Sequence, residues 1–167
     1  ISLLAFTRQD QARWDEAGML AESALSCEPS SGHAVHAQTH VLYETGQHET
    51  GRVWLDHWVA ESGRSASHRA HFSWHAALHE LALGDTEAVR RRYYSQLAPP
   101  TVEGVRSLID SASLLWRWRI TTSEWTGLDE AAPPPIEPVL EALDDALLDR
   151  PQTPFVALHA AIALAAA

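Results

Sequence analysis

The chain has 167 residues, which is enough for one ordinary domain with a sizeable core. Its hydrophobic fraction of 46% and charged fraction of 20% are those of a folded protein and exclude an intrinsically disordered one. The net charge is −10 and all twelve cations are arginines, so nucleic acid and anionic membrane surfaces are not expected partners.

A single cysteine, Cys27, rules out an internal disulfide and fits a reducing compartment. No apolar run reaches the roughly 18 residues that a membrane-spanning helix needs. The chain begins at Ile1 inside an apolar stretch and ends after FVALHAAIALAAA without a helix-ending signal. We therefore expect a truncated piece of a longer helical protein.

Apolar residues recur with helical period along the chain, and no segment alternates convincingly at period two. The sequence therefore predicts an all-α fold. An extended loop is expected over 121–135, which holds Gly127 and three consecutive prolines. The expected helices span about 1–8, 13–27, 31–45, 49–61, 67–83, 86–97, 102–120, 136–148 and 153 onward.

Small residues and helix stops follow the pattern of tetratricopeptide repeats. Ala17, Ala24 and a following Pro29 are typical of the second helix of such a repeat, where small side chains let paired helices approach. Gly46 and Gly84 are expected to end first helices, with Asp85 as the N-cap of the next helix. We predict antiparallel helix pairs forming a fragment of a right-handed superhelix over 1–120, then the loop, then a continuing helix pair over 136–167.

Two predicted helices carry histidines at four-residue spacing, which places each pair on one helix face. His36 and His40 lie on the earlier helix, and His71 and His75 on the later one, where His79 continues the row. Imidazole is the commonest metal ligand, so neighbouring pairs could hold a divalent ion such as zinc. A polar network of neutral histidines with hydroxyls and carboxylates, and a small-molecule pocket with histidine as general base, are the alternatives.

The ordered motifs WDEA, VHAQTHV, HFSWHAALHELALGD and LIDSASLLWRW resemble the tetratricopeptide repeat protein 38 family over roughly 3–120. The resemblance implies a helical-repeat fold, a longer parent chain and a cytoplasmic setting, but no reaction. This chain departs from the family at Tyr43, where the family usually has a glutamate. The positions that match the family's histidines and its Asp-Ser-x-Ser…Arg run are His36, His40, His71, His75, Asp110, Ser111, Ser113 and Arg117.

Stacked helix pairs most often act as scaffolds, so we expect a protein or small-molecule partner on the concave face. The rival is a metal-dependent or histidine-based enzyme that uses the four histidines. A real site requires side-chain nitrogen or oxygen atoms of at least three members of the cluster within about 5 Å of a common point. The concave-face candidates are His36, His40, His71, His75, Asp110, Arg117, Tyr43 and Trp74.

Overall fold

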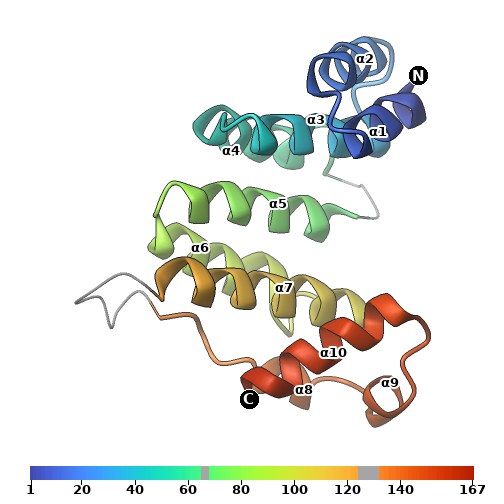
Figure 1. Ribbon diagram of the computed structural model, residues 1–167. Coiled ribbons are helices and arrows are strands. Elements are labelled where there is room, and N and C mark those ends of the chain that lie inside the picture. The colour runs from blue at the N-terminus through green and yellow to red at the C-terminus, as the bar shows by residue number, and fades with distance from the viewer. Residues whose placement is uncertain (65–67, 124–131) are drawn as a thin grey trace. The chain divides into compact units, whose positions relative to one another are not determined.

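A computed structural model describes residues 1–64, 68–123 and 132–167, and every regular element in these ranges is helical (Figure 1). The all-α prediction is therefore confirmed for the described part of the chain. The chain divides into two compact units, Ile1–Leu83 and Gly84–Ala167. None of the helices within the described ranges is both long and apolar enough to span a bilayer.

The first unit contains five helices that match the predicted ones to within two residues at every end. α1 packs on α2 and α3, α3 packs on α4 and α5, and the closest neighbour of α5 is α4. These helices are α1 (Ser2–Asp10), α2 (Trp14–Cys27), α3 (Gly32–Glu44), α4 (His48–Ala60) and α5 (Arg69–Ala82).

The core of the first unit lies between α3, α4 and α5. Trp58 is buried there against Phe72, with ring centroids 4.7 Å apart, and its indole N–H donates to the Pro29 carbonyl oxygen at 2.8 Å. That hydrogen bond ties the connection after α2 to α4, and it satisfies the polar end of a buried indole. The cluster consists of Val35, Leu55, Trp58, Val59, Phe72 and Ala76.

The predicted helix stops are confirmed in the backbone. Gly46 has a φ of +73° and Gly84 a φ of +78°, the left-handed conformation that ends a helix at little steric cost to glycine. The Asp85 carboxylate accepts a hydrogen bond from the Ala88 backbone N–H at 2.9 Å, as expected of an N-cap.

The second unit is built around α7, which contacts η1, α8 and α10. Trp118 of α7 is fully buried, and the Arg90 guanidinium lies 5.3 Å from the centroid of its ring. The elements are α6 (Thr86–Arg92), the π-helical turn η1 (Tyr93–Leu97), α7 (Gly104–Thr122), α8 (Glu137–Glu141), α9 (Asp145–Asp149) and α10 (Pro154–Ala166).

The prediction of one helix over 136–148 is wrong, because two short helices occupy this stretch. The Asp144 carboxylate accepts a hydrogen bond from the Ala146 N–H at 2.9 Å and so begins a new helix inside the predicted one. The predicted loop over 121–135 begins late, since α7 extends to Thr122, and its residues 124–131 lie outside the described residues.

Gly51, on α4, lies directly against the buried ring of His79 from α5. A Cβ atom added at Gly51 would lie 2.3 Å from Cε1 of His79, whereas one added at Gly18 of α2 would come no closer than 3.6 Å to any atom, with Val41 Cγ1 the nearest. The first contact is a clash and the second is ordinary packing. The α4–α5 contact therefore needs glycine at position 51.

We predict that Gly51→Ala lowers the free energy of unfolding by about 1–3 kcal/mol, because the fully buried His79 ring has no room to move. Gly18→Ala is the matched control and should raise it by up to about 1 kcal/mol, since alanine favours a helix. Urea denaturation of both variants measures the difference. Equal effects of the two substitutions would contradict the steric explanation.

Candidate metal centre

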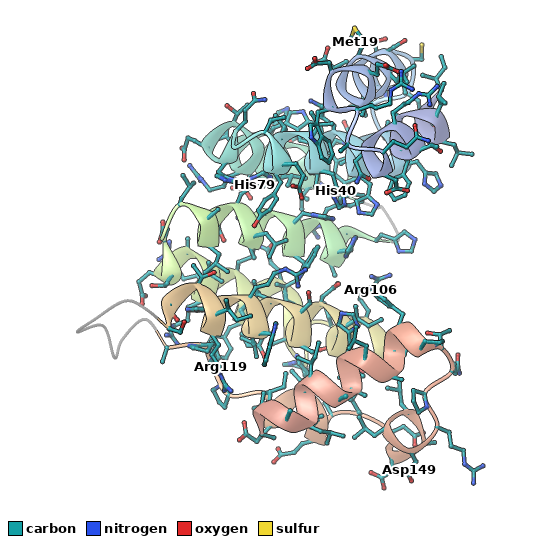
Figure 2. All side chains as sticks on the ribbon, viewed as in Figure 1. Met19, His40, His79, Arg106, Arg119 and Asp149 are labelled. Atoms are coloured by element: carbon teal, nitrogen blue, oxygen red, sulfur yellow. The ribbon has the colours of Figure 1, made fainter. Side chains whose placement is uncertain are left out.

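The histidines of α3 and α5 converge within the first unit. His36 and His40 are one turn apart on α3, and His71 and His75 are one turn apart on α5. Because α3 contacts α5, the two pairs face each other. Figure 2 shows His40 and His79 between the ribbons of α3 and α4 and that of α5. The predicted convergence of the four histidines is therefore observed.

The distances within the four-histidine cluster are those of direct contact. Nε2 of His36 lies 3.1 Å from Nε2 of His40 and 3.4 Å from Nε2 of His71. The His75 ring centroid is 4.9 Å from that of His36 and 4.9 Å from that of His40. One ring nitrogen from each of His36, His71 and His75 lies within 4.8 Å of the others.

Burial disfavours the charged form of three imidazoles of the cluster. It lowers the pKa of His36 to about 3, helped by repulsion from His40 and His71, and it lowers the pKa of His40 in the same way. The pKa of His75 is well below its ordinary value, again chiefly because its ring is buried. Each of these three rings therefore has an unprotonated nitrogen at neutral pH, which is the form that binds a metal ion.

One nitrogen of the cluster is left without a hydrogen bond. Nε2 of His75 is buried and has no partner among the described residues, and the residue is only 4% exposed. A buried polar atom without a partner costs free energy unless a ligand or water satisfies it. This orphaned nitrogen therefore indicates a ligand for the cluster.

The donor set and the distances fit zinc. Ligand nitrogens 2.0–2.1 Å from a tetrahedral zinc ion lie about 3.3 Å from one another, close to the two separations at His36. Among His36, His71 and His75, closing the widest separation to that value requires a change of about 1.5 Å. Four imidazoles favour zinc or another late transition metal over calcium and magnesium, which prefer oxygen ligands.

Residues from α1 and α5 surround the cluster. The Phe6 ring centroid lies 5.2 Å from that of His36, and Trp74 stacks on His71 with ring centroids 5.2 Å apart. The carboxylate of Asp10 opposes the lowering of the His40 pKa. Phe6 and Asp10 are missing from the predicted site. They have the same four-residue spacing on α1 as the histidine pairs, and that spacing is the signal that could have revealed them.

Tyr43, a predicted member of the concave face, lies in a different group. Its ring centroid is 5.1 Å from that of His48 and 5.5 Å from that of His79, and Nδ1 of His48 is 3.4 Å from Nδ1 of His79. His79 is fully buried, and burial together with repulsion from His48 lowers its pKa to about 4. This second group packs α3 and α4 against α5. The sequence did not reveal it, because no other histidine lies three or four residues from His48.

The remaining predicted site residues belong to the second unit. Asp110 is buried on α7, with Oδ1 3.8 Å from Nη1 of Arg106. Arg117 is exposed on the same helix and donates to the Ser113 hydroxyl. A place for them beside the histidines stays a prediction. His33, His57 and His68 are exposed, whereas His159 is buried in α10.

No protein-family model and no solved structure matches this chain.

The buried His79 predicts a loss of stability in acid. Its pKa of about 4 in the folded protein lies below the ordinary 6.5, so between these values the unfolded chain binds a proton that the folded protein does not. Stability is retained above pH 6.5 and falls as the pH approaches 4. We expect the wild type to lose roughly 1–2 kcal/mol more than His79→Gln between neutral pH and about pH 4.5.

Urea denaturation at several pH values measures this difference. His57→Gln is the control, because it removes a histidine that is exposed on α4. Parallel profiles for the wild type and His79→Gln would show that His79 does not carry the acid sensitivity.

Proposed function

We propose that this chain is a helical-repeat protein that binds one zinc ion between α3 and α5. His36, His71 and His75 supply three nitrogens and His40 is placed to supply the fourth. The observation that carries the proposal is the gathering of three ring nitrogens within 4.8 Å, one of them on a buried histidine without a hydrogen-bond partner in the described part of the chain. A closed site of four protein ligands is typical of structural zinc.

The repeat type is part of this proposal. In stacked helical repeats the first helices of successive pairs contact each other, and α3 touches both α1 and α5. Gly46 lies two residues after the end of α3, and Gly84 lies two residues after the end of α5. These contacts support tetratricopeptide-type pairing. Membership of the tetratricopeptide repeat protein 38 family, and the cytoplasmic setting that the resemblance implies, are part of the same proposal.

The zinc ion would link two first helices of the repeat. It would be bound to α3 and α5 at the same time, so it would stabilise the stack on which a partner docks. The ion therefore suits a scaffold with four histidine ligands. An enzyme is favoured instead if only three histidines bind, because the free position would then hold a water molecule whose pKa the metal lowers.

Zinc binding to protein purified without a polyhistidine tag tests the site. We expect one zinc per chain, and at a free zinc concentration 100 times Kd a gain of about 2.7 kcal/mol in stability. His75→Gln should abolish that gain, because it removes the nitrogen that lies deepest in the cluster. The measurements are isothermal titration calorimetry and urea denaturation with and without zinc.

His57→Gln is the matched control, since it removes a histidine that lies outside the cluster. Equal zinc binding by His57→Gln and His75→Gln would place the ion elsewhere. A wild-type protein that binds no zinc and gains no stability from it would exclude the proposal.

A further variant decides between four and three ligands. We expect His40→Gln to weaken zinc binding by at least about tenfold. The reason is that Nε2 of His40 lies 3.1 Å from Nε2 of His36, close to the separation of two ligands on a tetrahedral zinc ion. Substitution of cobalt(II) for zinc gives an independent readout, as the visible absorption of cobalt reports its coordination. An unchanged affinity and spectrum would assign the ion to three histidines and favour the enzyme.

A further inference from the structure

A groove lies between α2, α3 and α4, on residues separate from the four histidines. Its volume is about 670 Å³. Met19 of α2 stands at this groove and is 64% exposed, and Figure 2 shows it projecting from α2. The apolar part of the lining consists of Trp14, Met19, Leu25, Val41, Leu42 and Trp54.

The charged residues that line the groove are both acidic. Asp15 and Glu22 are exposed on α2, seven residues apart and thus two turns along one helix face. The cations nearest to this lining in the sequence are already engaged, Arg13 with Glu16 and Arg52 with Glu49. Within the described residues neither Asp15 nor Glu22 forms an ion pair, so the groove presents negative charge beside apolar surface.

The floor of the groove holds an unused hydrogen-bond acceptor. Oε1 of Gln38 is buried, lines the groove, and has no hydrogen-bond partner within the residues that the structure describes. It lies 4.0 Å from the position that a Cβ atom would take at Gly18, a residue that also lines the groove. A buried acceptor of this kind is satisfied by a donor from outside.

We propose that this groove binds a cationic amphipathic segment of a partner protein. Its apolar residues would pack on Trp14, Met19 and Trp54, and its Lys or Arg side chains would pair with Asp15 and Glu22. One donor would reach Oε1 of Gln38. Charge selects this occupant, because acidic peptides and nucleic acid are repelled by the same two carboxylates.

The proposal goes beyond zinc binding and gives the expected scaffold function a surface and a partner chemistry. No residue of α5 lines the groove, so the peptide and the ion occupy different surfaces of the first unit. Loss of one activity therefore does not entail loss of the other.

The test uses the full chain and a synthetic helical peptide of about 18 residues, with Leu and Trp on one face and Lys and Arg on the other. A matched peptide carries Glu in place of Lys and Arg. Fluorescence anisotropy measures binding, and peroxide oxidation of Met19 reports the place, since Met19 is the chain's single methionine. We expect the basic peptide to bind and to slow oxidation of Met19 severalfold, and the acidic peptide to do neither.

Variants separate the groove from general charge attraction. The double variant Asp15→Lys, Glu22→Lys should weaken binding of the basic peptide by at least about tenfold and leave zinc binding unchanged. Glu61→Lys with Asp149→Lys makes the same change in net charge at exposed residues outside the groove and should have little effect. Absence of binding, binding without protection of Met19, or equal weakening by the two double variants would overturn the proposal.

Discussion

The close approach of α3 and α5 is the contact on which the candidate site depends. It presses two pairs of imidazoles together, so a charge on His36 or His75 is opposed both by burial and by the neighbouring rings. The same approach places Nε2 of His36 close to Nε2 of His40 and Nε2 of His71. These distances are close to the separation of two ligands on a tetrahedral zinc ion. The packing of α3 against α5 is therefore the cause both of the neutral histidines and of their short separations. Both features suit the cluster to a metal ion.

α3 takes part in two chemically different surfaces. One of its faces carries His36 and His40, and the other contributes Gln38, Val41 and Leu42 to the groove with α2 and α4. The first surface is rich in nitrogen and mostly buried, which suits an ion. The second is open, apolar and acidic, which suits a chain segment. A helix that is contacted on several sides can serve both.

Local signals explain what the sequence predicted correctly. Helical period, Gly46 and Asp85 act within a few residues, and the facing histidines follow from four-residue spacing on two helices that pack together. The rest depends on distant contacts or on competing local bonds. Phe6 and Asp10 come from another helix, Tyr43 lies with His48 and His79, and the Asp144 cap divides a stretch whose apolar period is continuous.

The contact between Gly51 and His79 has a consequence for how sequences of this kind can diverge. The ring occupies the space that any side chain at position 51 would need, so position 51 is not free to change alone. A larger residue at 51 requires a smaller one at 79, and a glycine at 51 is retained only while a bulky residue fills the space. Among homologous chains the two positions should therefore covary, although 28 residues separate them in the sequence.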